Sequence, residues 1–554
     1  MALDVRHQEL VKQGDKLFAD KAPLNSLLQE TADHFYPERA HFTQSVMLGR
    51  EFAAHLTTSY PLICRRDLGN AFSSMLRPKG KQWFSIRSAY TEDDDASKQW
   101  LQYAAKVQRA AMYDRASLFT RATKEGDHDF AAFGQTVLSV ELNRARDALL
   151  YRCWHLRDVA WAENAEGKIG CVHRNWEPTL KQLHGTFGDK GLAGPMVNEL
   201  RLNPFRTVRV RHVVLESSDY AEPTGGKKWR TPYVSIYIDV ENGHLIEEKG
   251  IHGRYYVIPR WQTVSGSQYA FSPATVAALP DARLIQAMTL TLLQAGEKAA
   301  DPPMVAQQAV IRSDINLASG GVTWVDREYD ERFGKALSPI EFDRTGLQFG
   351  LQMQADTRAM IREAFYLDKL SLPPSDQSKP YTATEATYRV SEYIRQALPL
   401  FEPMEEDYNG QLCDETFSLL MRNGAFGPAN DVPERLRGAN VQFHFESPLL
   451  KAEGAERGSI FANGAELLKV AAEADPGVID TVDAPIALRG ALEGIGYPAA
   501  WLRTPDAMAQ RAQAREAKQA IAETIAGIGQ AGMAAEAAGK GAQALGLMEQ
   551  AKAA

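Results

Sequence analysis

The residues best suited to chemistry in this chain are two Cys-x-His pairs, Cys153 with His155 and Cys171 with His173. Two cysteines and two histidines form a sensible ligand set for zinc. Alternation along two strands could place all four side chains on one face of a sheet. The C-x-H spacing is nevertheless not typical of structural zinc sites. Half-buried strand residues are the simpler interpretation, so we predict no metal site.

Motifs for other chemistry are missing from the sequence. The run from Gly225 to Lys228 has neither the spacing nor the Ser/Thr of a phosphate-binding P-loop, so it is interpreted as an ordinary loop. No G-x-S-x-G elbow, H-E-x-x-H pair or EF-hand loop occurs. We therefore predict that the chain is not an enzyme, and we expect no catalytic residue and no cofactor.

Composition indicates a soluble, multi-part globular protein. The chain has 554 residues, and 44% of them are hydrophobic, which predicts about three to four structural units with sizeable cores. The net charge is −8, whereas a dedicated nucleic-acid binder is more often basic. Four widely spaced cysteines favour assembly in a reducing cytoplasm. We find no signal peptide and expect no membrane-spanning segment.

Hydrophobic periodicity predicts an α+β fold that is mainly helical. Helical spacing covers residues 5–20, 24–35 and 52–76, with a break expected at Pro61, and an aromatic strand follows at 82–86. The period then changes to two, and a hairpin is expected at Asn164–Gly167. The predicted strands are residues 137–142, 152–161, 170–175, 208–216 and 234–240. Together they predict a small β-barrel or sandwich inserted among helices.

A second helical region starts at Pro273 and runs to about Ala299. Its middle is apolar nearly all round, so the helix must be buried on several sides, by a large core or by neighbouring subunits. At 1.5 Å per residue it is roughly 40 Å long. Residues 347–370 should form an antiparallel partner. Strands are expected between the two helices, at 309–311 and 322–325.

The stretch from 371 to 412 is the most informative one. Its proline-rich loop cannot continue a helix, and it consists of Ser371, Leu372, Pro373, Pro374, Ser375, Asp376, Gln377, Ser378, Lys379, Pro380 and Tyr381. Thr382 and Glu385 then read as a capping box. Pairs joining Glu385, Arg389 and Glu392 support the helix that follows, and Pro399 and Pro403 should kink it.

This order of elements resembles the portal, or head-to-tail connector, family of short-tailed bacteriophages, where a tunnel loop precedes a long kinked helix. The T-A-T-E-x3-R-x2-E run at 382–392 is typical of that family. Two other segments agree: L-x-P-x-G-x2-W-F at 76–84, and R-W at 260–261 followed by a turn and an L-P-D helix start. Ala270 replaces the usual glycine of that turn. The resemblance covers residues from about 40 to 500.

The resemblance implies how the chain is divided. Residues 1–272 would form the wing, which contains the β-rich subdomain. Two stem helices, 273–300 and 347–370, would flank a clip at 301–346. The tunnel loop would occupy 371–382 and the long kinked wing helix 383–430. Residues 431–504 would form a helical crown. The alanine-rich 505–554 would be a helix or barrel stabilised by ring neighbours, or a mobile tail.

The resemblance also implies function. It implies a ring of about twelve subunits with closed cyclic symmetry, located in the virion at one capsid vertex, between capsid and tail. The ring would be the channel for packaging and ejecting double-stranded DNA. Expected partners are the capsid and scaffolding proteins, the terminase large subunit, and the tail adaptor and nozzle proteins. Membranes are not expected among them. Another phage structural protein is the alternative, and a DNA-packaging enzyme is a weaker one.

Charge fits such a channel. Lys379 is the only basic residue of the predicted tunnel loop, with Lys369 just before it. One lysine per subunit could touch phosphates without holding them. If the channel lining shares the negative sign of the whole chain, it repels the phosphates and limits sticking during passage.

Overall fold

The computed structural model describes most of the chain. The described residues are 5–45, 49, 51–80, 82–89, 94–220, 229–316, 322–330, 332, 334–340, 345–370, 404–438, 440–445, 460–471, 482–494 and separate positions between 497 and 518. The chain forms two compact units. Unit 1 comprises Met1–Ile86, Ala104–Asp431 and Val441–Leu450, and unit 2 comprises Arg87–Tyr103, Val432–Asn440 and Lys451–Ala554.

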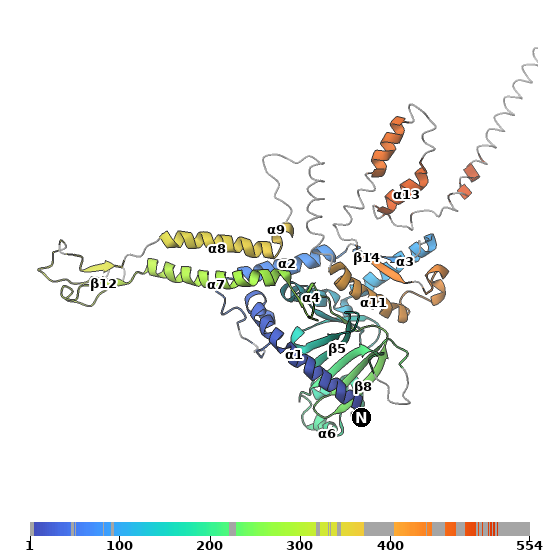
Figure 1. The fold of residues 1–554 in the computed structure, drawn as a ribbon, viewed down its shortest axis with the longest axis horizontal. Helices are drawn as coiled ribbons and strands as arrows, with labels where there is room; N and C mark the ends of the chain where they lie inside the picture. Colours follow the sequence, from blue (N-terminus) through green and yellow to red (C-terminus); the bar gives the residue numbers. More distant parts are fainter. Residues whose placement is uncertain are drawn as a thin grey trace, which may run out of the picture. The chain divides into compact units, whose positions relative to one another are not determined.

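Unit 1 begins with one long helix, α1 (Val5–Phe35) (Figure 1). The two separate N-terminal helices expected from the sequence are therefore wrong, because α1 continues through Pro23. Helix α2 (Tyr60–Leu76) begins next to Pro61, which occupies the first turn, where the missing N–H costs no hydrogen bond. The expected break at Pro61 is instead a helix start. A short turn, η1 (Pro37–Arg39), follows α1.

Helices α3 (Asp95–Met112) and α4 (Phe119–Phe133) lead into the sheets, with η2 (Arg115–Ser117) between them. Helix α4 packs against α2 and is buried over residues 126–133. Strand β1 (Phe84–Ser88) pairs with β14 (Val441–Phe445), the strand expected there from the sequence. Trp83 stacks on Phe445 with ring centroids 6.2 Å apart, which joins two segments far apart in the chain.

The β-rich region expected over 136–264 forms two antiparallel sheets. The smaller has the order β3-β2-β9, from Leu149–Trp154, Val137–Leu142 and Tyr256–Val257. The larger has the order β4-β5-β6-β7-β8, from Val159–Glu163, Ile169–Trp176, Val210–Glu216, Tyr233–Asp239 and His244–Ile251. The β4–β5 hairpin turns at Asn164–Gly167 as predicted, and Gly167 has φ +75°.

One expected strand is divided. Residues 152–161 cross from the small sheet to the large one through a 3-10 turn, η3 (Leu156–Asp158). Lys21 of α1 lies beside this turn, fully buried, and donates to the carbonyls of Leu156 and Val159. Its amine also lies over the Trp161 and Tyr269 rings. These contacts fix α1 to the point where the chain changes sheet.

The large sheet is covered on one face by α1 and carries two short helices at its end. These are α5 (Leu180–Phe187) and α6 (Gly194–Leu202), joined by η4 (Gly188–Gly191). Thr179 and Gln182 form a capping box at the start of α5. Both helices pack on Val208, Val210 and Ile246. Strands β10 (Gln262–Thr263) and β11 (Ala270–Phe271) then form a small ribbon before the next long helix.

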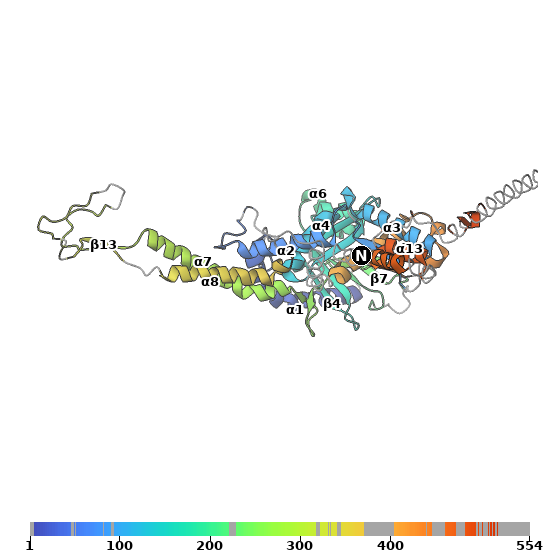
Figure 2. The same cartoon turned by 90° about the horizontal axis from the view of Figure 1, so that it is seen from above.

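Helix α7 (Pro273–Ala300) confirms the helix predicted from Pro273. Helix α8 (Thr345–Ala364) returns beside it, and Figures 1 and 2 show the two lying side by side. The expected 347–370 helix is interrupted at Tyr366, which has φ +56°, and α9 (Leu367–Leu370) follows. The α7–α8 pair is called the helical hairpin below.

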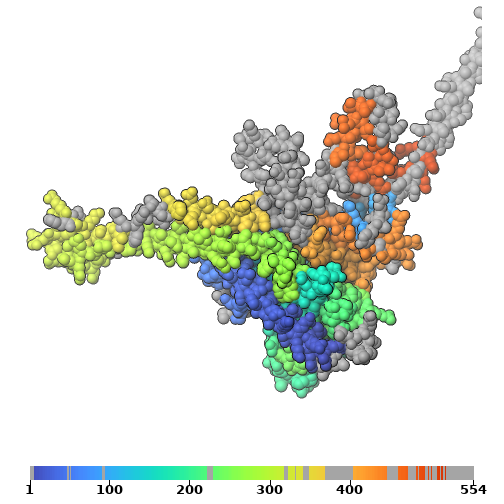
Figure 3. Space-filling view, in the orientation of Figure 1, coloured from blue at the N-terminus to red at the C-terminus, as the bar shows by residue number. Residues whose placement is uncertain are grey.

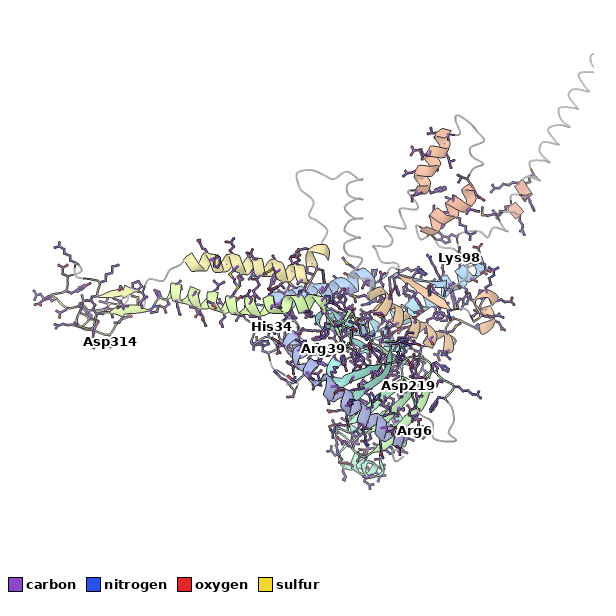
Figure 4. The ribbon with its side chains drawn as sticks, in the orientation of Figure 1. Arg6, His34, Arg39, Lys98, Asp219 and Asp314 are labelled. Carbon is purple, nitrogen blue, oxygen red and sulfur yellow. The ribbon has the colours of Figure 1, made fainter. Side chains whose placement is uncertain are left out.

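The described residues between α7 and α8 form a small module, 301–340, called the tip module below. Strand β12 (Met304–Ala306) pairs with β13 (Leu337–Pro339). The strands predicted at 309–311 and 322–325 reduce to a single bridge between Ile311 and Val325. Asp314, labelled in Figure 4, belongs to this module.

After the undescribed stretch 371–403, the chain continues as a π-helix, η6 (Met404–Gly410), and then α11 (Gln411–Arg422). The helix end expected near Gly424 is confirmed, since Gly424 has φ +71°. The short turns η7 (Ala429–Asp431) and η8 (Glu434–Leu436) follow. In unit 2, α13 (Ala484–Gly494) is tied to the first turn of α3 by an Arg489–Asp95 ion pair. Residues 460–471 are also helical.

Candidate functional site

The two Cys-x-His pairs do not form one site. Cys153 lies on β3 of the small sheet and Cys171 on β5 of the large sheet, so the arrangement on one face considered from the sequence is wrong. Cys153 lies 3.5 Å from Asp129 Oδ2, whereas Cys171 lies 3.3 Å from His173 Nε2. Among the described residues, no group of three or more His, Cys, Asp or Glu side chains could hold a metal ion.

The ionisable groups around Cys153 stabilise the fold. Arg39 donates to both carboxylate oxygens of buried Asp129, at 3.0 and 2.8 Å. Burial first, then Asp129, raises the pKa of the Cys153 thiol well above its usual value, which disfavours a reactive thiolate. Burial also lowers the pKa of His155 to about 3. Its Nδ1 accepts from the Arg157 amide at 3.1 Å, as expected of a neutral ring.

The helical hairpin is the more informative feature, and its base is firmly fixed to α4. Ser272 caps α7, and its hydroxyl donates to the Ala131 carbonyl at 2.7 Å. Thr275 donates to the Ala132 carbonyl at 2.8 Å. Gly134 ends α4 with φ +69°, and a Cβ there would overlap the backbone of Phe271 and Ser272. The base therefore requires glycine at this position.

One glutamine holds the middle of α7 to the segment before α2. Gln286 Oε1 accepts from the Thr57 and Thr58 amides at 2.7 and 3.0 Å, and its Nε2 donates to the Thr58 carbonyl at 2.8 Å. The Thr57 hydroxyl donates to the Gln286 carbonyl at 2.8 Å. Periodicity could not reveal this clamp, because its partners lie 228 and 229 positions away.

Beyond the clamp, α7 lies beside α8. Gln354 donates to the Thr289 hydroxyl at 2.7 Å. Gly350 faces Leu292, and a Cβ at Gly350 would lie 2.8 Å from Leu292 Cδ2, so the glycine allows the two helices to approach. All the fully buried residues of α7 lie between Ala274 and Ile285. The far half of the hairpin is a two-helix layer without a core of its own.

The hairpin carries large apolar side chains that the described residues leave exposed. In α7 these are Val276, Leu284, Leu290 and Leu293, and in α8 they are Phe349, Leu351, Met353 and Met360. Figure 3 shows the face of the hairpin seen in that view without covering protein. Exposed apolar side chains gathered on one element are typical of an interaction site. The burial expected for this apolar helix is thus supplied by the described part of its own chain only between Ala274 and Ile285.

Helix α7 is also long and apolar enough, by length and composition, to cross a membrane. Length and composition alone are weak evidence for a membrane span, so the absence of a membrane-spanning segment stays a prediction. Its partner α8 exposes Asp356, Arg358 and Glu363. A lipid environment around the hairpin would have to accommodate these charges, which is costly. Protein partners that cover apolar residues and leave charges in water fit the hairpin better.

The tip module has a hydrogen-bonded frame with apolar residues outside it. Tyr329 donates to the Gly334 carbonyl and accepts from the Ala336 amide, both at 2.6 Å. Arg312 pairs with Asp326 across the Ile311–Val325 bridge. Exposed apolar side chains surround this frame, with Trp324 71% exposed; the others include Val305, Val322, Val325 and Ile340. A hydrogen-bonded module with an exposed tryptophan suits docking of another protein.

The π-helix η6 is held by a buried ionic cluster. Arg77, at the end of α2, pairs with Asp127 of α4 and donates to Asn409 Oδ1 at 2.6 Å. Its guanidinium lies over the Tyr408 ring, 4.8 Å from the centroid. The cluster therefore connects α2, α4 and η6, and it was not foreseen because a lone arginine gives no periodic signal.

The predicted tunnel loop lies outside the described residues. This applies to Ser371, Leu372, Pro373, Pro374, Ser375, Asp376, Gln377, Ser378, Lys379, Pro380 and Tyr381. It also applies to the helix cap and motif residues Thr382, Glu385, Arg389 and Glu392, and to the kink residues Pro399 and Pro403. These assignments remain predictions.

Comparison with known families now adds to this geometry. A family model described as bacteriophage head to tail connecting protein matches residues 7–502. The probable portal protein of Bordetella phage BPP-1 is 24% identical over 498 residues, which cover 87% of this chain and 86% of that protein. The portal protein of Salmonella phage epsilon15 is 20% identical over 534 residues, covering 95% and 94%. The family resemblance in the sequence is confirmed.

Solved structures give weaker likenesses. The neck of an empty gene transfer agent (GTA) particle is 13% identical, with a TM-score of 0.34 over 78% of this chain and 93% of that one. The virion of the native gene transfer agent particle is 12% identical, with a TM-score of 0.32 over 78% and 94%.

Proposed function

This chain belongs to the bacteriophage head to tail connecting protein family, and we propose that it is the portal protein of a phage virion, located at the capsid vertex where head and tail meet. The premise is supported by two portal proteins that align with most of the chain. Its role would be structural, as the channel for double-stranded DNA during packaging and ejection. No covalent chemistry is part of this proposal.

The uncovered helical hairpin carries the proposal. Leu290 and Leu293 of α7 and Phe349 of α8 are 46%, 55% and 67% exposed. At about 25 cal/mol per Å², covering such side chains contributes on the order of 1 kcal/mol each. A ring of about twelve copies repeats that gain at every interface, and head-to-tail contacts close when the rotation is right. The hairpins would then form the stem wall of the channel.

The remaining parts follow from this arrangement. The tip module would be the clip, on which the terminase large subunit docks first and the tail adaptor and nozzle proteins later. The β-rich part of unit 1 would lie in the wing, near the capsid and scaffolding proteins. Residues 371–381 would project into the channel. The acidic balance of the chain, −8, would then keep DNA from sticking if the lining shares its sign.

Another phage structural protein, such as a tail or scaffold component, is the alternative. It shares the lack of catalytic motifs, and it differs in assembly, because only a portal requires a closed ring with a hole. A packaging enzyme is disfavoured by the absence of a P-loop from the sequence.

The hairpin can be tested by its effect on assembly. We expect the purified full-length chain to have a mass that is a multiple of 61.3 kDa, and Leu293→Asp to reduce it toward a single chain. The aspartate would put a charge into each interface, where desolvation without a partner is costly. Light-scattering mass after size exclusion measures this, and circular dichroism checks that the variant folds.

Leu202→Asp is the matched control. Leu202 is a leucine of α6 with 86% exposure, far from the hairpin in sequence, so its replacement should leave assembly unchanged. The proposal fails if a folded Leu293→Asp variant assembles as well as the original chain, or if both leucine variants lose assembly equally.

A further inference from the structure

A cavity of about 200 Å³ lies within unit 1, away from the helical hairpin. It is bordered by the β4–β5 turn, the start of β7, the segment from Arg254 to Arg260 and the start of α11. Pockets for drug-sized ligands are larger, about 300–1,000 Å³. The size therefore suits an ion or one small group.

The lining of the cavity is positively charged. Lys168, Arg254 and Arg260 contribute three cations, against one carboxylate, Asp407. Arg260 is already engaged, since it pairs with Glu163 and donates to the Gly167 carbonyl at 3.2 Å. Lys168 pairs with Glu166 on the surface, at 2.8 Å. Neither of these two cations is fully available to a ligand.

Arg254 is the cation with donors to spare. Its Nε donates to the Tyr233 hydroxyl at 3.1 Å, and its backbone amide donates to Glu415 Oε1 at 2.9 Å. Within the described ranges, no hydrogen bond or ion pair reaches its two terminal nitrogens. A guanidinium held at Nε presents those nitrogens as a planar fork, which matches the two oxygens of a carboxylate or phosphate.

A second observation is the buried cation behind the cavity. Arg174 is only 3% exposed, stacks on Trp154 at 3.9 Å and donates from Nε to the Tyr256 hydroxyl at 2.8 Å. Its Nη1 is buried without a hydrogen-bond partner, and no carboxylate of the described residues pairs with it. Tyr256 also lines the cavity, so Arg174 contacts a residue of the cavity wall.

Buried charges are normally paired, because an unpaired one loses its hydration without compensation. Here the buried Arg174 guanidinium has no ion pair among the described residues, and the Arg254 guanidinium lies near the Asp414 and Glu415 carboxylates without an ion pair to its terminal nitrogens. Tyr256 also bonds His212 Nδ1 at 2.6 Å, so its hydroxyl is engaged with two side chains. The groups left unsatisfied here are therefore hydrogen-bond donors, which an oxyanion can accept from.

We propose that this cavity is a binding site for a small oxyanion, a phosphate or carboxylate group, held by the terminal nitrogens of Arg254 and steered by Lys168. The oxyanion has two sources, a free anion such as inorganic phosphate or an acidic side chain of a second copy of this chain. The site does not depend on the proposed function.

The test is a titration of the full-length chain with inorganic phosphate at constant ionic strength, followed by calorimetry and by the unfolding temperature. We expect saturable binding that Arg254→Gln weakens about tenfold or more, as for the loss of charge-assisted hydrogen bonds. Lys168→Gln lies on an exposed turn and keeps the fold, and it should weaken binding by about two- to fivefold. Arg121→Gln, an exposed arginine of α4, should change nothing.

Assembly distinguishes the two sources. If the anion is free, phosphate binds the assembled chain and Arg254→Gln assembles normally. If it comes from a second copy, phosphate binds only dissociated chains and Arg254→Gln weakens assembly. The proposal is overturned if the original chain shows no saturable phosphate binding and Arg254→Gln assembles normally. It is also overturned if Arg254→Gln and Lys168→Gln bind phosphate as tightly as the original chain does.

Discussion

Removing Arg77 from its buried cluster should destabilise unit 1 in a way that depends on pH. The Arg77 and Asp127 side chains are 2% and 0% exposed, and Asn409 and Tyr408 complete the guanidinium's surroundings. Breaking a buried ion pair by removing one partner costs about 3–5 kcal/mol, because an uncompensated charge stays behind. We expect a loss of that order for Arg77→Met at pH 7.

The remaining carboxyl gives the pH dependence. Burial already raises the pKa of Asp127, and the Arg77 guanidinium opposes that rise. Without Arg77, the folded-state pKa of Asp127 should move further above its unfolded value. The destabilisation by the unpaired Asp127 carboxylate is then fully present above the folded-state pKa of Asp127. It is relieved as the pH falls through that pKa, because the folded state takes up a proton at Asp127. The loss caused by Arg77→Met should therefore shrink between pH 7 and pH 5.

Asp127→Asn provides the contrast. It leaves Arg77 buried, and a guanidinium does not lose its proton at these pH values, so the loss should be nearly independent of pH. Arg121→Met removes the exposed partner of Glu125 on the same helix and should cost under about 0.5 kcal/mol. Urea unfolding followed by tryptophan fluorescence at several pH values measures all three variants.

The reasoning would be refuted by a loss below about 1 kcal/mol for Arg77→Met at pH 7, since buried pairs cost more than that to break. It would equally be refuted if the losses for Arg77→Met and Asp127→Asn showed the same pH dependence. Replacing both residues, as Arg77→Met with Asp127→Leu, should recover much of the stability lost by either single change.

Two further predictions concern the positions that fix α7 and α1. Gly134→Ala should lower the free energy of unfolding by about 3 kcal/mol or more, because the added Cβ overlaps the Phe271 backbone and φ is positive. Gly167 has φ +75° and open space around it, so Gly167→Ala should lower the free energy of unfolding by only about 1 kcal/mol in the same urea assay. Equal losses at the two glycines would contradict the overlap. Burial lowers the pKa of Lys21 from 10.5 to about 7, with Asp158 opposing the shift. Between pH 7 and pH 10.5 the unfolded chain therefore binds more protons at Lys21 than the folded chain does. The free energy of unfolding should rise by about 2 kcal/mol from pH 7 to pH 9. Lys21→Met should lack that part of the rise, and an unchanged rise would refute the assignment.

The sequence predicted those helices and strands whose pattern lies within a few neighbouring residues. Strand β2, strand β14 and the start of α7 at Pro273 were predicted because alternation or a proline-led helix start lies within a few residues. Strand β8 was missed because His244–Ile251 carries charged residues on an exposed edge, which hides alternation. The predicted strand at 152–161 was divided because Lys21, more than a hundred residues away, binds the turn in its middle.

Proline positions illustrate the same limit. The sequence cannot distinguish a helix break at Pro61 from a helix start there, because neither position requires a backbone N–H from the proline. Two helices were expected, at 5–20 and 24–35, yet α1 continues through Pro23. The α1 residues Leu28, Ala32 and Phe35 are buried. The Gln286 clamp and the Arg77 cluster arise from tertiary contacts that have no local signature. The tunnel loop at 371–381 stays a prediction.

Electron microscopy of the purified full-length chain in ice, classified in end-on views, tests the ring most directly. The account predicts closed rings of about twelve subunits, with a central hole wide enough for a DNA double helix and walls formed by the α7–α8 hairpins. Monomers, or open filaments at high concentration, would contradict it.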